Sequence, residues 1–438
     1  MSTLITKKRV ALGVLAATLG ASFTLGGGSG PVSADPTQLT ALVGVGSDTT
    51  QDVMNAMAGF NFGANYLAIN SGAATSYRHL ISFDASPSQT ASDNCITPVI
   101  NGPSFTRPNG SGSGRKALFA ASGLSSAGWT GPSFTLDNLT VLPPCAATVN
   151  ISGTANFARS SSVSSTLGTD VTYLPFGRDA VGFASYRPGG GSPLTTLTRK
   201  QLIDSYDNTS RETVTDPDAP GNGNVSGLLT IIPCGMQTSS GTMQFFRDVV
   251  TQSNPANEAA ATALCTPNAA SRMQESKGDI LKIRGDALDV TLDNFVVISG
   301  YSAAAYIAQA NGVSNPNGFS DIRIGSISDD STTSGGTNLG SPIVGTAPNL
   351  TPNATFYVSP GVGRDVYNVV RRSLIVNTGT GNPLSNSYVA LFADTDTGAP
   401  NTSVLCAQTA RINQFGFATI ANCGNYLATT RAWDTGVS

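Results

Sequence analysis

Three short segments of the sequence combine small residues with hydroxyl side chains, and each leads into a run with helical spacing. The residues that could bind a ligand are Ser47, Thr49 and Thr50 in the first segment, Ser111, Ser113 and Gly114 in the second, and Ser240, Gly241 and Thr242 in the third. The N-terminus of a helix has unpaired N–H donors and a partial positive charge, which suit an anion. The predicted chemistry is therefore the binding of a small oxyanion by backbone and hydroxyl donors.

Each segment also has an ordinary structural interpretation. In the first, Ser47 or Asp48 could cap a helix, and we assign Asp48 to capping because its charge would repel an anion. The second could be a flexible loop before Arg115, and the third a capped helix with Phe245 and Phe246 in the core. The recurrence of one design in three segments favours a binding site over unrelated caps.

The residues that could perform catalysis are too few for an enzyme. His79 is the only histidine, and no Gly-x-Ser-x-Gly motif accompanies it, which argues against a Ser-His-Asp hydrolase. The acidic residues are scattered and do not suggest a glycosidase pair. The sequence has no CxxC pair, which argues against a metal site. We therefore expect no enzymatic activity, no metal and no cofactor.

The charge of the chain excludes one class of partner. Its 24 Lys and Arg residues are balanced by 27 Asp and Glu residues, and the net charge is −3. A protein that binds nucleic acid needs a basic surface to neutralise phosphates, and no basic stripe is present. Apolar residues make up 40% of the chain in periodic blocks, which is typical of a folded protein.

The first residues of the chain predict export. A basic stretch at 7–9 precedes an apolar stretch at 10–25, and the small residues at 32–34 fit a cleavage site. We predict a signal peptide over 1–34 that is cleaved before Asp35, which leaves 438 − 34 = 404 residues. The apolar stretch is short for a membrane span, although an uncleaved anchor is the alternative. No cysteine lies near the cleavage site, so we expect a secreted or surface-associated protein without a lipid anchor.

Six cysteines lie beyond the predicted signal peptide, and an even number in an exported chain favours disulfides. Many pairings are possible, and proximity in the sequence favours Cys95–Cys145, Cys234–Cys265 and Cys406–Cys423. Each bond would stabilise the fold by about 3–4 kcal/mol through the entropy of the unfolded chain.

The elements that would position these segments alternate between strands and helices. The expected strands cover 41–45, 80–83, 228–233 and 321–327, with a further extended segment at 170–186. The expected helices cover 115–122, 197–206 and 240–250, with a largely helical segment at 294–310 and helical spacing from Val53 onward. The polar segment 328–353 is predicted to be an exposed loop or linker. This alternation indicates an α/β fold with parallel or mixed sheets and helices on their faces.

Five segments resemble the phosphate-binding proteins of ABC transporters, a family of the class II periplasmic binding protein superfamily. The segments are Gly44-Val45-Gly46-Ser47-Asp48-Thr49-Thr50, the run from Gly110 to Lys116, Phe157-Ala158-Arg159-Ser160-Ser161, the run from Leu174 to Val181, and Ser240-Gly241-Thr242. The resemblance spans most of the mature chain, although each motif is short. The three hydroxyl-rich segments predict the binding of an oxyanion, and the resemblance names a protein family with this kind of ligand.

The resemblance implies a two-lobed periplasmic-binding-protein-like fold with hinge strands between the lobes and a ligand in the cleft. It implies a first lobe over 40–180 and 355–438 and a second lobe over 181–354, with a ligand-dependent equilibrium between open and closed forms. The implied function is the capture of phosphate or a similar anion by a monomer that serves a membrane ABC permease.

Two positions depart from the family pattern. Ser161 stands where the family has a ligand-binding aspartate, and Met236 stands where it has an arginine. We expect Ser161 to contact the ligand, and Arg159 or Arg178 to supply the missing positive charge. The alternative is a secreted or surface interaction protein that keeps the fold but has lost transport.

Overall fold

The computed structural model describes the greater part of the chain beyond the predicted signal peptide. The described residues are 42–59, 80–85, 95–99, 101–124, 133–134, 145, 149–163, 170–207, 211–219, 224, 226–268, 272–289, 292–376, 383–393, 403–425 and 430–431. They belong to one compact unit, Pro31–Ser438. The predicted signal peptide and His79 lie outside the described residues. In the part of the chain that is described, every helix is too short or too polar to cross a bilayer.

Within the described residues, ten strands form one mixed sheet. Its order is β10-β11-β12-β8-β17-β7-β1-β2, and β13 and β18 also pair with β8. The strands are β1 Leu42–Gly46, β2 Leu80–Ser82, β7 Phe157–Ser160, β8 Val171–Tyr186, β10 Thr213–Thr215, β11 Leu228–Pro233, β12 Phe295–Ser302, β13 Arg323–Ile324, β17 Gly363–Arg371 and β18 Thr430–Arg431. Strand β1 is parallel to β2 and β7, whereas β8 is antiparallel to both β12 and β17. The predicted mixed α/β fold class is confirmed.

Four two-stranded pairs lie outside this sheet. They are β3 Cys95–Ile96 with β4 Phe105–Thr106, β5 Ser133–Phe134 with β6 Val149–Asn150, β9 Thr196–Leu197 with β14 Ser326–Ile327, and β15 Ile343–Val344 with β16 Thr351–Pro352. The pair β15–β16 lies inside the segment 328–353 that was predicted to be a loop, so part of that segment is ordered as a hairpin.

Among the described helices, α2 has 13 residues and α6 has 12, and the others are shorter. They are α1 Gln51–Met57, α2 Gly110–Ser122, α3 Arg199–Tyr206, α4 Gly241–Phe245, α5 Pro255–Thr262, α6 Gly278–Asp289, α7 Ala303–Ala310, α8 Ala354–Val358, α9 Ser373–Val376, α10 Pro383–Phe392 and α11 Thr409–Gln414. A π-helical turn at Phe246–Val250 continues α4, and 3-10 turns occur at Pro188–Gly190 and Phe319–Asp321.

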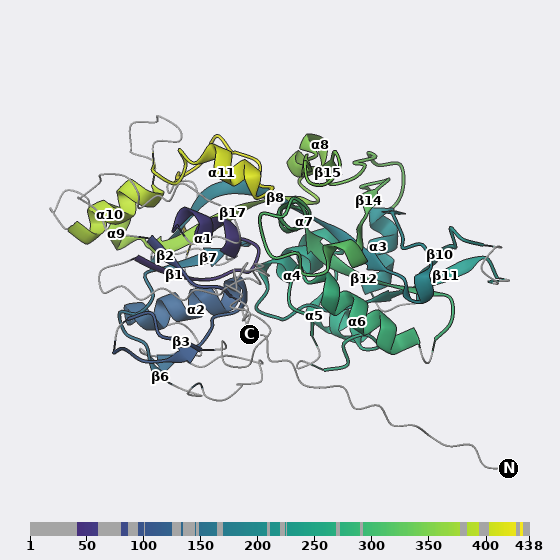
Figure 1. Cartoon of the computed structure of the whole chain (residues 1–438), viewed down its shortest axis with the longest axis horizontal. Coiled ribbons are helices and arrows are strands. Elements are labelled where there is room, and N and C mark those ends of the chain that lie inside the picture. Colours follow the sequence, from purple (N-terminus) through teal and green to yellow (C-terminus); the bar gives the residue numbers. More distant parts are fainter. Residues whose placement is uncertain are drawn as a thin grey trace, which may run out of the picture. The chain divides into compact units, whose positions relative to one another are not determined.

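Strand β8 connects the two halves of the sheet. It has 16 residues, and it pairs with β17 up to Ala180 and with β12 from Val181 onward. Figure 1 shows it between the elements around β17 and β1 and those around β12 and β11. Its residues are almost all buried and mostly apolar, although the charged Asp179 is buried among them. The lobe boundaries at 180/181 and 354/355 stay a prediction.

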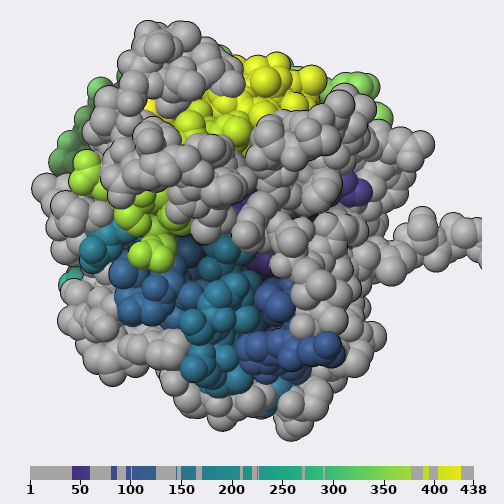
Figure 2. All heavy atoms as spheres, turned by 90° about the vertical axis from the view of Figure 1, so that its left-hand side faces the viewer, coloured from purple at the N-terminus to yellow at the C-terminus, as the bar shows by residue number. Residues whose placement is uncertain are grey.

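The C-terminal segment packs on the half of the sheet that contains β1. Leu42 and Val53 share a buried core with Tyr388 and Phe415, which are more than three hundred positions away along the chain. Figure 2 shows blue segments of the first third of the chain and yellow-green segments of its last part on the same face. Strand β17 pairs with β7, which pairs with β1, and this pairing brings residues of β17 near the loop after β1.

The expectation of a largely helical segment at 294–310 is wrong for its first half. Phe295–Ser302 is strand β12, and only Ala303–Ala310 forms a helix, α7. The first half is rich in β-branched and aromatic residues and is buried on both faces, as a central strand requires. Ser302 ends the strand and caps the helix, because its hydroxyl accepts the Ala305 N–H at 3.1 Å.

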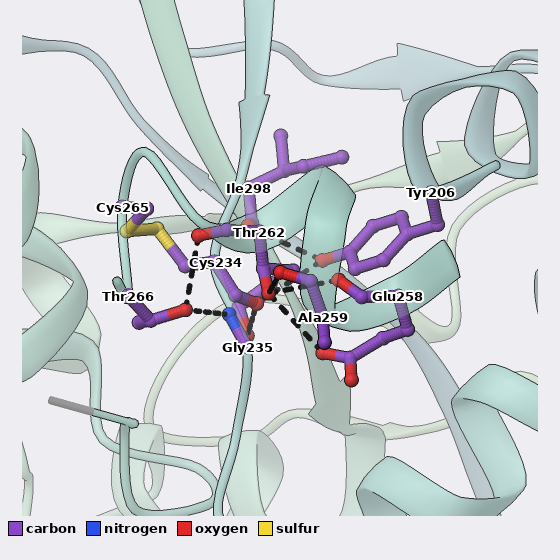
Figure 3. The surroundings of a disulfide bond; sticks show 10 residues. Tyr206, Cys234, Gly235, Glu258, Ala259, Thr262, Cys265, Thr266 and Ile298 are labelled. Atoms are coloured by element: carbon purple, nitrogen blue, oxygen red, sulfur yellow. Dashed lines mark hydrogen bonds between the residues drawn. A yellow bond between two sulfur atoms is a disulfide. The ribbon is translucent and has the colours of Figure 1, made fainter. Parts of the chain in front are cut away.

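The three predicted disulfides, Cys95–Cys145, Cys234–Cys265 and Cys406–Cys423, are confirmed. Figure 3 shows the second of them, which ties the residue after β11 to the segment after α5. Beside it, the Gly235 N–H donates to Thr266 Oγ1 at 3.1 Å, and the Tyr206 hydroxyl donates to the Cys234 carbonyl at 3.3 Å. These contacts fix the base of the loop that leads to Ser240.

Candidate oxyanion site

Donors from both halves of the sheet meet at the carboxylate of Glu275. The Thr49 backbone N–H and the Thr49 hydroxyl each donate to Glu275 Oε1 at 2.9 Å. The Ser240 hydroxyl donates to Oε2, and the Thr242 backbone N–H donates to the same atom at 3.4 Å. Glu275 is 1% exposed. Donors of the first and third predicted segments are therefore bonded to a carboxyl group of the protein itself, and their binding of an external oxyanion stays a prediction.

Backbone pairing places Glu275 at this position. The Gln237 N–H donates to the Met273 carbonyl at 2.8 Å, and the Met273 N–H donates to the Gly235 carbonyl at 2.9 Å. Ser276 then turns the chain with a positive φ of 56°. The segment that carries Glu275 is thus bonded to the loop that carries Ser240, and the carboxylate needs little further ordering to reach its donors.

Arg364 of β17 supplies positive charge beside the carboxylate. Its Nη2 donates to Thr242 Oγ1 at 2.7 Å, and that hydroxyl lies 2.9 Å from Thr49 Oγ1. An arginine only donates and a carboxylate only accepts. Because the Thr49 hydroxyl donates to Glu275, the Thr242 hydroxyl must donate to Thr49 Oγ1. The hydrogen bonds therefore run in one direction from Arg364 to Glu275.

Asp179 of β8 balances the charge of Arg364. One carboxylate oxygen, Asp179 Oδ2, accepts Arg364 Nη2 at 2.8 Å and Nε at 3.2 Å. The same carboxylate accepts the Ser302 hydroxyl and the Ala304 N–H, each at 3.0 Å. Asp179 is 0% exposed and Arg364 is 5% exposed. This ion pair is thus buried and fully hydrogen-bonded, which is the condition under which a buried pair is tolerated.

Ser111 and Ser161 lie against the third segment, and their hydroxyl groups pack directly on Gly241. The Ser161 N–H donates to Ser111 Oγ at 2.9 Å, and the two hydroxyl oxygens are 3.2 Å apart. A Cβ atom on Gly241 would lie only 2.4 Å from Ser111 Oγ and 2.6 Å from Ser161 Oγ. Both serines are therefore near the site, in direct contact with the start of α4.

Ser113 and Gly114, the other predicted residues of the second segment, belong to α2, which packs against Ser239 and the end of β1. The Gly112 N–H donates to the Ser239 carbonyl at 2.9 Å. A Cβ atom on Gly114 would lie 2.5 Å from the Gly46 Cα, so the absence of a side chain lets α2 approach the end of β1. Ser113 is buried on the same helix.

The two arginines proposed from the sequence as counter-charges donate elsewhere. Arg159, which is 0% exposed, donates to the Gly46 and Phe83 carbonyls at 2.7 Å each, and its burial lowers its pKa to about 10. Arg178 donates to the Tyr357 carbonyl at 2.6 Å and pairs with Asp365 at 3.0 Å. The arginine next to the Thr49–Thr242 pair is Arg364.

The prediction that Ser47 or Asp48 caps α1 is wrong. Its N-cap residue is Thr50, and no side chain accepts a capping bond there. Asp48 Oδ2 instead accepts Gln237 Nε2 at 3.3 Å, and Oδ1 is buried without a partner, as are the hydroxyl oxygens of Ser47 and Thr50. Burial, and then the charge of Glu275, raise the pKa of Asp48 to about 8.

This raised pKa predicts how stability depends on pH. The folded protein keeps the Asp48 proton up to about pH 8, whereas the unfolded chain loses it near 3.8, so stability falls as pH rises through this window. Between pH 6 and 8 we expect Asp48→Asn to remove a slope of about 1 kcal/mol per pH unit. Urea unfolding of both proteins at several pH values measures it. Parallel pH profiles for the two proteins would contradict the assignment.

Two cavities border the site. The first, of about 20 Å³, lies beside Glu275 and is also lined by Asp48, Thr49 and Lys277. It has room for about one water molecule. The second, of about 410 Å³, is lined by Ser161, Arg364 and eight other residues that include Asp248 and Asp365. Asp365 pairs with Arg178 and Asp248 pairs with Arg247, so both acidic side chains of this cavity have cationic partners.

Glu275 and Arg364 were missed by reasoning from the sequence. Arg364 lies in strand β17 without any motif around it that indicates a ligand-binding role. Glu275 is an isolated acid between Gln274 and Ser276. Its role depends on Thr49, which is 226 positions away. Only the folded structure brings these groups together.

Comparisons with known proteins give distant structural likenesses. No protein-family model matches the chain, and no curated protein matches its sequence. A phosphate-binding protein from Stenotrophomonas maltophilia is 11% identical with a TM-score of 0.39, over 88% of this chain and 91% of that one. PstS from Borrelia burgdorferi is 11% identical with a TM-score of 0.34, over 87% and 99%. A possible phosphate-binding protein from Planctomyces limnophilus is 11% identical with a TM-score of 0.35, over 87% and 94%.

Proposed function

We propose that this chain is an exported, non-catalytic binding protein for a small oxyanion of the phosphate class. The observation that carries the proposal is the convergence of Thr49, Ser240 and Thr242 on two carboxylate oxygens, with Arg364 behind the two threonine hydroxyls. The donors come from both halves of the sheet. A solute bound there would therefore hold the halves together, as a binding protein for transport requires.

The donors are sufficient for useful affinity. Thr49 contributes an N–H and a hydroxyl, Ser240 a hydroxyl and Thr242 an N–H. Hydrogen bonds to a charged group contribute about 1.5–3 kcal/mol each, so four of them supply about 6–12 kcal/mol before the costs of association. Micromolar binding requires about 8 kcal/mol. Delivery to an ABC permease belongs to the same proposal.

A second candidate is an exported interaction protein that keeps the fold without transport. One observation favours it, since Glu275 already satisfies the donors and the adjoining space holds about one water molecule. The two candidates differ in a measurable property. If the chain is a binding protein, an oxyanion should stabilise it against unfolding by mass action, whereas an interaction protein should show no change in stability.

Titration of the mature protein with inorganic phosphate and sulfate tests the proposal. We expect phosphate to bind with a Kd of about 1 mM or tighter, which corresponds to at least about 4 kcal/mol. Replacing both Ser240 and Thr242 with alanine should weaken phosphate binding at least tenfold, because two hydroxyl groups are lost from the site. Calorimetry and thermal unfolding measure both quantities.

The control for this experiment is a double replacement far from the site. Thr213→Ala with Thr215→Ala removes two exposed hydroxyl groups from β10, at the edge of the sheet, and should leave the affinity unchanged. In a chain that also carries Glu275→Ala, unchanged affinity after the Ser240 and Thr242 replacements would exclude this site. A protein that responds to neither anion, with or without the Glu275 side chain, would favour the interaction protein.

A further inference from the structure

We infer that Glu275 is a built-in competitor of the external solute, so that the chain closes on its own carboxylate when no solute is present. The inference rests on the proposed function and concerns how that site is regulated. Glu275 takes donors from Thr49 on one half and from Ser240 and Thr242 on the other. It therefore makes the contacts between the halves that a bound oxyanion would make.

Competition follows from the space and the charge at the site. The cavity beside Glu275 has about 20 Å³, which is room for about one water molecule, so a five-atom oxyanion cannot enter while the side chain stays. An anion placed next to the carboxylate would also be repelled in a site from which water is excluded. The solute must therefore displace Glu275 rather than join it.

The attachment of Glu275 to the chain strengthens this competition. A group tethered by a short linker acts at an effective concentration of about millimolar, even when the linker is flexible. Here the bonds between Gln237, Met273 and Gly235 hold the linker in place, which reduces the entropy that the carboxylate loses on binding. An external oxyanion therefore binds with an apparent affinity far below that of the empty donors.

Other contacts between the halves keep the closed form compact around this site. The Ser239 hydroxyl donates to the Asn109 carbonyl at 2.7 Å, and Gln237 Nε2 donates to Asn109 Oδ1 at 2.9 Å. The Ser162 hydroxyl donates to Gln244 Oε1 at 3.0 Å. Arg364 of β17 also donates to Thr242 Oγ1 and to the Gly241 carbonyl, so both neutral and charged groups join the two halves next to Glu275.

Glu275→Ala tests the inference by calorimetric titration with inorganic phosphate. We expect the variant to bind phosphate at least tenfold more tightly than the wild type, because the donors become free and the repelling charge is removed. Glu275→Gln, which keeps the shape of the side chain, serves if the alanine variant does not fold, and it should bind at least threefold more tightly. Glu212→Ala removes a carboxylate beside β10 and should match the wild type.

The possible outcomes separate this inference from the function on which it rests. Tighter phosphate binding by Glu275→Ala, with Glu212→Ala unchanged, supports it. Equal affinity of the wild type and Glu275→Ala overturns the competitor and leaves the oxyanion-binding function in place. Weaker binding by Glu275→Ala overturns it as well, because Glu275 would then assist the solute. Absence of phosphate binding in both folded proteins overturns the proposed function itself.

Discussion

Replacing Arg364 with alanine should lower the free energy of unfolding by about 3–5 kcal/mol, because Asp179 would keep a buried charge without its partner. Asp179 is 0% exposed, and its remaining donors, Ser302 and Ala304, are neutral. Urea denaturation followed by circular dichroism measures this change. The same variant should bind phosphate more weakly, since the positive charge beside Thr242 is lost.

A neighbouring ion pair provides the control for this prediction. Arg178 and Asp365 form an ion pair at 3.0 Å with side chains that are 27% and 18% exposed. Asp365→Ala should therefore cost about 1 kcal/mol or less, as partly solvated pairs do. Equal losses of stability in Arg364→Ala and Asp365→Ala would show that burial does not increase the contribution of the Asp179–Arg364 pair to the free energy of unfolding.

Removal of the Cys234–Cys265 disulfide is the second change with a large expected effect. Replacing both cysteines with serine should lower the free energy of unfolding by about 2–5 kcal/mol, since the bond closes a loop with a sequence separation of 31. The loss should also loosen the chain between Cys234 and Ser240, where the Gly235 N–H bonds to Thr266 Oγ1. Amide hydrogen exchange at Gly235 and Ser240 should become faster.

The Cys406–Cys423 bond is the matched control for this second prediction. Its removal should also destabilise the protein, because it closes a loop with a sequence separation of 17. It lies in a different core, with Leu42 and Phe415. Removal of the Cys406–Cys423 bond should therefore speed exchange of the Gly235 amide no more than the lower global free energy of unfolding explains. Equally fast exchange at Gly235 in both variants would mean that the Cys234–Cys265 bond has no specific effect on the site loop.

Much of the fold could be predicted because its strands and helices carry local signals. The apolar run at 228–233 and the β-prone segment at 170–186 correspond to β11 and β8. The three disulfides followed from neighbouring cysteines. The segment 294–310 could not be divided from its composition, because a central strand and a buried helix are both apolar. Only the pairing of β12 with β11 and β8 shows where the strand ends.

The candidate site could be predicted only in part, for a physical reason. The residue types and close spacing of Ser240, Gly241 and Thr242 indicate a binding role from the sequence alone. Arg364 and Glu275 do not, since each acquires its role from contacts with distant parts of the chain. The sequence likewise gave no reason to expect that the donors would be occupied by an internal carboxylate.

The central claim is that one set of donors serves either Glu275 or an external oxyanion. A crystal structure of Glu275→Ala grown with inorganic phosphate tests it most directly. We predict phosphate bonded to the Thr49 N–H, the Ser240 hydroxyl and the Thr242 N–H, in place of the missing carboxylate. Phosphate bound elsewhere, or an empty site in a folded protein, would contradict the claim.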